Sequence, residues 1–285
     1  QANFEKIPGS PIAYWVSERD LFLFEQTKTI GKVSSPRRAI QTGDGDRFIK
    51  QWFEISNRLI DYESHLSRGL NDLKKWYLMS NGGTLRKWYG NIEYVVLWEN
   101  NGEEIKNTGK AIIPNEELYF DKAIVWNRIS SDGLAFRYHN EGILCGDASP
   151  FIHSVEILYE LIGYLNSKLG VHFLKCINPT LAVQTGSVAK IPFLEASRFQ
   201  NEDIVKHNIS LSKSDWVSHE TSWDFETHPL IQADQDSLQL AYQAWESKVT
   251  QDFYQLHANE VELNRIFIDI YGLQDELTPE VKLKD

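Results

Sequence analysis

The segment 76–90 brings together the side-chain types that contact duplex DNA. Gly82 and Gly83 give it a mobile backbone that can approach a partner closely. Amide side chains suit adenine, basic ones suit phosphates or guanine edges, and aromatic ones can stack or wedge. The candidate DNA-contacting residues of this segment are Asn81, Arg86, Lys87, Trp88 and Tyr89. The alternative on chemistry alone is a β-hairpin with core aromatics and a solvated basic pair.

A second candidate is the polar turn 128–133, which lies between two strand-like runs. Turns that a rigid sheet presents often carry recognition residues. Arg128 and Ser130 are therefore candidates for contact with base edges. An ordinary hairpin turn is the alternative.

Catalytic and metal-binding patterns are missing from the sequence. Residues 43–46 (Gly-Asp-Gly-Asp) resemble part of a calcium loop but lack its later ligands and closing Glu. The eight histidines are scattered, and there is no phosphate-binding loop, HExxH motif or nucleophile elbow. We therefore expect no catalytic, cofactor-binding or metal-ligating residues. Cys145 and Cys176 have no metal-ligand spacing, which predicts reduced core thiols in an intracellular protein.

The net charge of −11 is unevenly distributed. Residues 1–140 hold 19 basic and 18 acidic side chains, whereas residues 141–285 hold 10 and 22. Within 34–91 the counts are 10 basic and 6 acidic, a net charge of +4. A surface facing phosphates is therefore expected in the first half, and the acidic half is expected to be scaffold or a protein-binding surface.

Length and composition indicate a globular protein of one or two domains. The 285 residues are 42% apolar and 12% aromatic. There is no apolar run of the ~20 residues that span a bilayer, and no signal-peptide pattern. Met79 is the only Met, so we interpret the chain as an excised fragment of a bacterial cytoplasmic protein.

Strand and turn signals dominate from about residue 39 to 150. Runs of β-branched and aromatic residues at 94–98, 123–126 and 134–138 predict strands. A turn at 100–102 is expected to lead into a return strand from Ile105.

Helical periodicity follows. The apolar face 155–165 predicts a helix over 154–170, with Gly170 as its C-cap. Ser212, with Asp215 three residues later, predicts the start of a second helical block. Residues 234–271 predict a long helix that ends at Gly272. Trp216 and Trp223, seven residues apart, are expected on one helical face as core residues.

Several segments, in order, resemble one family. Residues 4–15 (FEKIPGSPIAYW) are similar to the stretch after the catalytic domain of BREX phage-defence adenine methyltransferases, the PglX family. The Thr-Gly motif at 41–48 resembles the opening of the recognition region, and KWYGN at 87–91 and WNRISS at 126–131 are again PglX-like. The segment 178–192 resembles the close of a recognition domain, and 216–225 the helical region after it.

The resemblance implies a parent enzyme that methylates adenine at N6 with S-adenosylmethionine, marking host DNA for phage defence. The chain lacks the glycine-rich cofactor turn and the Asn/Asp-Pro-Pro-aromatic motif; Asn178-Pro179-Thr180-Leu181 only begins like the latter. We therefore expect an inactive specificity fragment without a cofactor of its own. The expected fold is α+β, with a mixed or antiparallel sheet followed by a helical C-terminal region.

The expected organisation is a connector at 1–36, a DNA target-recognition domain at 37–204 and a helical scaffold at 205–285. Its partners would be double-stranded DNA, the methyltransferase domain of the same protein and other BREX components. Beside the loop residues above, the candidate DNA contacts are Arg37, Arg38, Thr42, Arg47, Lys50 and Arg137. The open alternatives are a protein-interaction module, an unrelated enzyme and a DNA-mimicking acidic surface.

Overall fold

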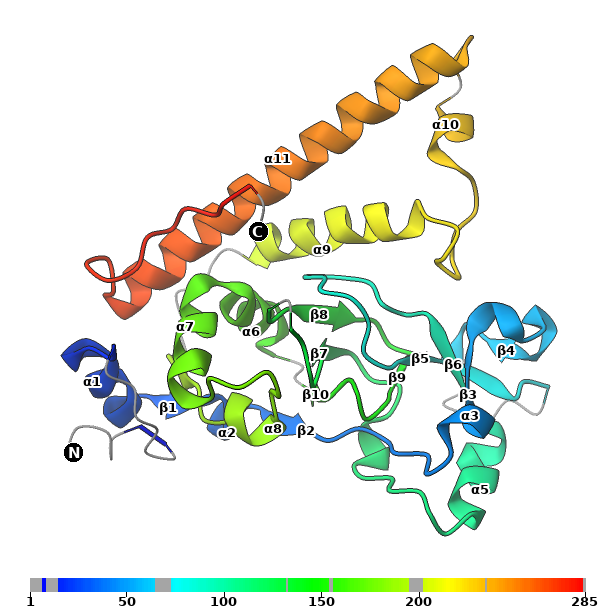
Figure 1. The fold of residues 1–285 in the computed structure, drawn as a ribbon, viewed down its shortest axis with the longest axis horizontal. Helices are drawn as coiled ribbons and strands as arrows, with labels where there is room; N and C mark the ends of the chain where they lie inside the picture. Colours follow the sequence, from blue (N-terminus) through cyan, green and yellow to red (C-terminus); the bar gives the residue numbers. More distant parts are fainter. Residues whose placement is uncertain are drawn as a thin grey trace.

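The computed structural model describes residues 7–8, 15–64, 73–131, 133–153, 156–194, 202–233 and 235–283. In the described part of the chain, two larger sheets, a two-stranded sheet and their covering helices form the body of the molecule, and a pair of C-terminal helices extends from one side of it (Figure 1). The predicted α+β class, with mixed sheets and a helical C-terminal part, is confirmed.

The first sheet is antiparallel, with strand order β2-β10-β7-β8. Its strands are β2 (Ser35–Arg37), β7 (Ala123–Trp126), β8 (Phe136–His139) and β10 (Phe151–His153). All residues of β7 and β8 are buried, so this part of the sheet is covered on both faces. The predicted strands at 123–126 and 134–138 are therefore confirmed, the second with a shift of its ends.

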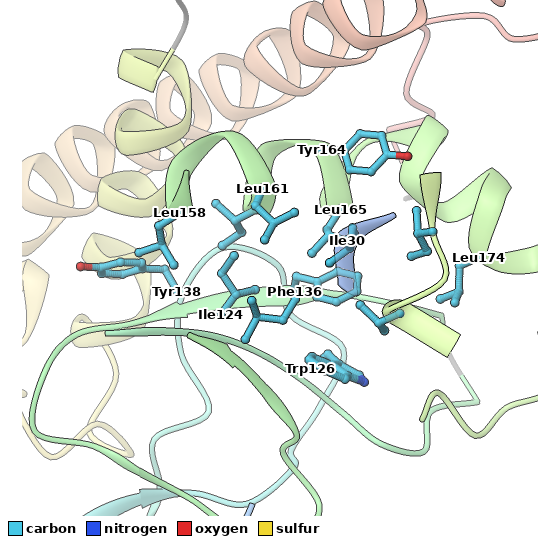
Figure 2. Packing of buried hydrophobic residues seen from close by; sticks show 14 of the residues in the cluster. Ile30, Ile124, Trp126, Phe136, Tyr138, Leu158, Leu161, Tyr164, Leu165 and Leu174 are labelled. Carbon is cyan, nitrogen blue, oxygen red and sulfur yellow. The ribbon is translucent and has the colours of Figure 1, made fainter. Parts of the chain in front are cut away.

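Helix α6 (Leu158–Asn166) covers one face of this sheet. Figure 2 shows Leu158, Leu161 and Leu165 of the helix facing Ile124, Phe136 and Tyr138 of the strands. Burial of such apolar side chains is the main force that holds the layers together.

The second sheet is mixed, with order β3-β6-β5-β4 and with β9 also paired to β5. Its strands are β3 (Ile49–Gln51), β4 (Ile60–Asp61), β5 (Trp76–Ser80), β6 (Tyr94–Leu97) and β9 (Leu144–Cys145). Strands β5 and β9 run parallel, so their carboxyl ends lie at the same edge of the sheet. This sheet has its own apolar cluster, which includes Phe48, Tyr77 and Trp98.

The expected return strand from Ile105 is wrong. Asn100, Asn101 and Gly102 all have left-handed φ values, but the chain continues as helix α5 (Glu99–Asn107). Ile105 is buried within this helix, where it packs in the second apolar cluster. The turn predicted at 100–102 is therefore present, but it lies at the start of helix α5.

The helix expected over 154–170 is two helices, α6 and α7 (Lys168–Ile177). Ser167 separates them and caps α7 by accepting a hydrogen bond from the Gly170 amide. Gly170 is therefore in the first turn of α7 and is not a C-cap. Its missing side chain lets α7 approach the end of α6, because a Cβ there would lie 2.5 Å from the Tyr164 carbonyl oxygen. Residues 154 and 155 lie outside the described residues.

The described part of the expected connector is integrated into the core. Helix α1 (Glu18–Gln26) buries Leu23 and Phe24 in the main apolar cluster. The following strand β1 (Lys28–Thr29) pairs with β11 (Pro192–Phe193), and α2 (Ile30–Val33) leads into β2. The buried Asp20 carboxylate accepts from His172 Nε2 at 3.0 Å, which fastens α1 to α7. Residues 15–36 therefore share one core with the sheets.

The C-terminal part consists of α9 (Glu202–Val217), α10 (Pro229–Gln232) and α11 (Leu238–Tyr271). Helix α11 is 34 residues long, and the left-handed residue Gly272 ends it as the sequence predicts. Its C-terminal half packs in the main core, whereas its N-terminal half diverges from α9 and projects from the body (Figure 1). The remaining short helices are α3 (Gly45–Phe48), α8 (Thr185–Val188), and the 3-10 helices η2 (Trp52–Glu54), η3 (Asn57–Leu59) and η4 (Glu116–Leu118).

Two expectations for this region are wrong. Ser212 is not a helix start, because α9 already contains it in its third turn. Trp216 and Trp223 do not share a helix, since α9 ends at Val217. Both pack against the main core as expected, and Trp223 stacks on Tyr62 with ring centroids 5.1 Å apart.

Candidate nucleic-acid interface

Three loops that are distant in the sequence meet where strands β5, β7 and β9 end. They are residues 81–85, 127–131 and 146–148, which we call the loop cluster. The Gly146 amide donates to the Ser80 carbonyl at 2.8 Å, and the Arg128 amide donates to the Ala148 carbonyl at 3.0 Å. The cluster is therefore held by the backbone as well as by side chains.

The loop after β5 is fixed against its neighbours. The Gly82 amide donates to Ser149 Oγ at 2.7 Å, and Asn127 Nδ2 donates to the Gly83 carbonyl at 2.7 Å. Gly83 has a φ of +120°, and a Cβ there would lie 2.5 Å from the Asn91 side chain. Only glycine fits this position without displacing the loop.

Asn81 contacts the third loop of the cluster, residues 146–148. Its Oδ1 accepts from the Ala148 amide at 3.4 Å, a long contact that holds the side chain only weakly. Its Nδ2 donates to no other described residue. An amide in this state can still present both a donor and an acceptor to an adenine edge.

Arg128 is ion-paired to Asp147, with Nη1 and Oδ2 2.7 Å apart. The other oxygen of Asp147 accepts from Gln41 Nε2 at 2.7 Å. The guanidinium is thus oriented by a carboxylate that is itself held in place. Sequence reasoning missed Asp147 and Gln41, because residues 106 positions apart give no local signal of their contact.

Ser130 contacts the segment that follows α7 and lies next to exposed apolar side chains. The Ser130 amide donates to the Leu181 carbonyl at 3.2 Å, which joins the loop to the segment after α7. Ile129 and Leu181 are 65% and 61% exposed, and Leu85 is also exposed. Apolar side chains among polar loops suit thymine methyl groups or insertion between base steps. In the sequence, these three side chains are recognisable only as single apolar residues within polar turns.

Arg86 and Lys87 lie outside the loop cluster and form ion pairs with the C-terminal helices. Arg86 donates to the Tyr89 carbonyl at 2.9 Å and is ion-paired with Asp215 of α9. Lys87 Nζ lies 2.8 Å from Glu260 Oε2 of α11. Acidic residues of the second half therefore neutralise basic residues of the first, which accounts for part of the charge asymmetry.

Trp88 and Tyr89 are buried in the main core and are not offered to a ligand. The Trp88 indole Nε1 donates to Glu260 Oε1 at 2.7 Å, and the Trp88 backbone bridges to Phe136 and Tyr138 of β8. Burial, followed by the nearby Asp224 carboxylate, raises the pKa of Tyr89 well above its usual value. The aromatic pair thus supports the loop cluster from inside, and the expected stacking or wedging does not occur in this conformation.

The expected phosphate contacts are dispersed. Arg37 and Arg38 are exposed on and just after edge strand β2, and neither forms an ion pair with a described residue. Arg47 is ion-paired with Glu104, and Lys50 donates to the Asp46 carbonyl. Thr42 is buried and is not available to DNA.

Arg137 is buried in β8 and has no exposed surface. Burial, opposed by Cys145 and assisted by Arg86, lowers the pKa of Arg137 to about 10. His139, also completely buried, has its pKa lowered to about 3, mainly by burial and then by Arg137. A direct DNA contact by Arg137 is therefore not compatible with this structure.

The calcium-like segment 43–46 and the two cysteines have structural surroundings. Asp44 caps α3 by accepting from the Arg47 amide, so the calcium-like segment starts a helix. Among the described residues, no group of three or more His, Cys, Asp or Glu side chains can hold a metal ion. Cys145 and Cys176 are free and buried, and desolvation raises the pKa of each thiol to about 12. No described helix is long and apolar enough to cross a membrane.

A groove of about 1060 Å³ lies between the C-terminal helices α9, α10 and α11, with residues 85–88 and Leu134 of the body at one wall. Its polar walls include Arg86, Lys87 and Glu260. Its apolar lining comes largely from one face of α11 and includes Leu134, Leu211, Trp245, Val249, Phe253 and Leu256. Val249 and Phe253, which lie within the helix predicted over 234–271, are exposed on this face.

The chain is similar over its full length to two curated relatives. The adenine-specific methyltransferase PglX of Lacticaseibacillus casei (strain Zhang) is 38% identical over 300 residues, covering 100% of this chain and 25% of the relative. The adenine-specific methyltransferase BrxX of Escherichia coli O9:H4 (strain HS) is 33% identical over 291 residues, covering 99% and 23%. The expected resemblance is confirmed, and the chain spans about a quarter of these relatives' length.

No family model matches the chain. Among solved structures, the Type IIL restriction-modification enzyme MmeI in complex with DNA matches with a TM-score of 0.47 and 12% identity. That match covers 88% of this chain and 34% of the MmeI chain.

Proposed function

We propose that this chain is the target-recognition portion of a BREX-type adenine-specific DNA methyltransferase, and that the loop cluster reads the bases of duplex DNA. The observation that carries the proposal is the meeting of two loops from different sheets, the loop after β5 that holds Asn81 and the loop after β7 that holds Arg128 and Ser130, which both contact Ala148. The names of the two relatives support it, because both are adenine-specific methyltransferases and both match the whole chain.

Under this proposal the work is divided within one longer polypeptide. The part outside this chain, in the bacterial cytoplasm, would bind S-adenosylmethionine, extrude the adenine and transfer the methyl group. This chain would follow it in sequence and hold the neighbouring duplex in register, with residues 37–204 as the recognition domain and 205–285 as scaffold. Exposed Arg37 and Arg38, with Arg47 and Lys50, would supply phosphate contacts.

The test is selection from a randomised duplex pool at ~50 mM salt, where phosphate contacts are strong. We expect enrichment of one short asymmetric motif that contains adenine. Arg128→Ala and Asn81→Ala should each relax one position of it, by roughly 5- to 150-fold, because a bidentate base contact contributes about 1–3 kcal/mol. Lys248→Ala, which removes an exposed charge on α11, is the matched control and should leave the motif unchanged.

Two outcomes would contradict the proposal. Loss of the motif with Lys248→Ala but not with Arg128→Ala would place recognition outside the loop cluster. Absence of enrichment, by this chain and by the intact polypeptide in the same assay, would favour a protein-interaction role.

We further propose that the groove and the exposed face of α11 receive the methyltransferase portion of the same polypeptide. The relatives are about four times longer than this chain, and their name assigns methyl transfer to the whole protein. Trp245, Val249 and Phe253 recur at helical spacing on the face that lines the groove. An apolar stripe of this length is normally covered by another element.

Phe253→Asp tests this docking. In the isolated chain the exposed side chain contributes little, so the free energy of unfolding should be almost unchanged. In the intact polypeptide the same change should cost about 1–3 kcal/mol, because an apolar contact is lost and a charge is buried. Tyr254→Asp, exposed on the same helix but outside the groove, should be neutral in both. A neutral Phe253→Asp in the intact polypeptide would refute the docking.

A further inference from the structure

The buried guanidinium of Arg137 is connected to the loop cluster by a chain of two hydrogen bonds. Arg137 Nη2 donates to Asn127 Oδ1 at 2.8 Å. Asn127 Nδ2 then donates to the Gly83 carbonyl at 2.7 Å. Asn127 also directly precedes Arg128, so it holds one loop of the cluster while it belongs to another.

The burial of the Arg137 guanidinium is expected to destabilise the fold. Within the described part of the chain, its Nε and Nη1 atoms donate to no protein atom, and no carboxylate pairs with it. The lowered pKa, about 10, still leaves the group charged at neutral pH. A buried charge without a counter-ion destabilises a fold, and an apolar side chain of similar volume is often equally or more stable. Stability therefore does not explain why an arginine is present.

The polar surroundings of Asn127 explain it better. Without Arg137, the Asn127 amide would have no donor fixing its oxygen, and the amide could rotate away from Gly83. Among the described residues, the Ser149 hydroxyl and packing would then be what holds Gly82 and Gly83. Two consecutive glycines adopt many conformations, so this loop needs external restraint to keep one.

We propose that Arg137 is a positioning residue for DNA sequence recognition: acting through Asn127, it fixes the Gly83 backbone and so the loop that carries Asn81. This inference rests on the proposed function of the loop cluster. It reassigns Arg137 from contact with DNA to support of the residues that make the contact.

Two substitutions break the connection at different points without emptying the site. Arg137→Met keeps the length of the side chain and removes the charge. Asn127→Asp keeps the size and offers Arg137 an ion pair, but it places a carboxylate oxygen against the Gly83 carbonyl, where a donor is required. His139→Leu is the matched control, because His139 is equally buried on the same face of β8 but lies outside the chain of hydrogen bonds.

The measurements are thermal stability, affinity for selected and for unrelated duplexes, and hydrogen exchange of the Gly82 amide. We expect Arg137→Met and Asn127→Asp to melt at or above the temperature of the parent chain. The ratio of selected to unrelated affinity should fall at least ~10-fold in both, with unrelated affinity unchanged, and Gly82 should exchange faster. His139→Leu should change neither the ratio nor the exchange.

The results separate this inference from the function on which it rests. If the parent chain shows no sequence preference, the proposed function fails, and the exchange of Gly82 alone decides whether Arg137 positions the loop. An unchanged affinity ratio, or an unchanged Gly82 exchange rate, in both variants would overturn the inference. A loss of stability that accompanies every loss of specificity would also overturn it, because it would indicate a general structural role.

Discussion

Glu260 of α11 connects this helix to Lys87 and Trp88 of the body, and its removal should have a large effect on stability. The side chain is 13% exposed and accepts two hydrogen bonds, from Trp88 Nε1 at 2.7 Å and from Lys87 Nζ at 2.8 Å. Glu260→Ala leaves the buried indole N–H without an acceptor and Lys87 without its counter-ion. Because no other described residue accepts from the indole, local rearrangement offers little compensation.

The magnitude follows from these contacts. A hydrogen bond to a charged group contributes about 1.5–3 kcal/mol. The ion pair adds roughly 1 kcal/mol or less, since the Lys87 side chain is 28% exposed and screened by solvent. We therefore expect Glu260→Ala to lower the free energy of unfolding by about 2–4 kcal/mol. Glu260→Gln retains an acceptor for Trp88 and should cost only about 1 kcal/mol.

Urea unfolding at 25 °C, followed by tryptophan fluorescence, measures both variants. Lys87→Met is measured as a second variant. It should lower the free energy of unfolding by about as much as Glu260→Gln does. An alanine variant within about 0.5 kcal/mol of the parent, or a glutamine variant as unstable as the alanine variant, would show that the Trp88 hydrogen bond does not hold α11 to the body. The selected DNA motif should persist in Glu260→Gln, because Lys87 lies outside the loop cluster.

Three further predictions concern the loop cluster and the buried face of β8. Gly83→Ala should cost more than about 1 kcal/mol and alter the selected motif, because its φ of +120° and the nearby Asn91 side chain leave no place for a Cβ; melting and selection check this. Asp147→Ala should raise affinity for unrelated duplexes severalfold and relax the motif, since Arg128 loses the group that neutralises and orients it; binding titrations at two salt concentrations would show it. His139 has a folded pKa of about 3 and an unfolded value near 6.5, so its contribution is present above pH 6.5 and is lost as the pH falls toward 3. The chain should lose about 2 kcal/mol between pH 7 and 5 through this group, and His139→Leu should remove that part of the pH dependence.

Local patterns predicted the elements whose stability is local. The strands at 94–98 and 123–126 were expected from runs of β-branched and aromatic residues, because such side chains fit a pleated, buried surface. The end of α11 at Gly272 was expected because glycine readily adopts the left-handed conformation in which many helices end. The predictions that were wrong concerned elements whose sequence pattern fits more than one structure. Gly170 lies where a helix end is plausible, but close packing against Tyr164 places it inside α7.

The candidate site was predictable only in part. Asn81, Arg128 and Ser130 were expected from polar segments beside strands, and the structure brings the two loops that carry them into contact through Ala148. The equally plausible pair Arg86 and Lys87 faces the other way, toward α9 and α11. A basic side chain in a turn has the same local sequence whether it faces solvent, DNA or an acidic helix.

The sequence by itself determined the family resemblance, the α+β class, the long C-terminal helix and the segments that hold the candidate residues. These depend on residue type and on periodicity over a few turns or strands. Only the tertiary structure decided which polar residues share an edge, which are buried and which pair with one another. The pairing of Lys87 with Glu260 joins residues 173 positions apart, and the hydrogen bond from Gln41 to Asp147 joins residues 106 apart. Such contacts depend on how the sheets and helices pack, because a side chain's partners are set by its neighbours in space and leave no periodic trace along the chain.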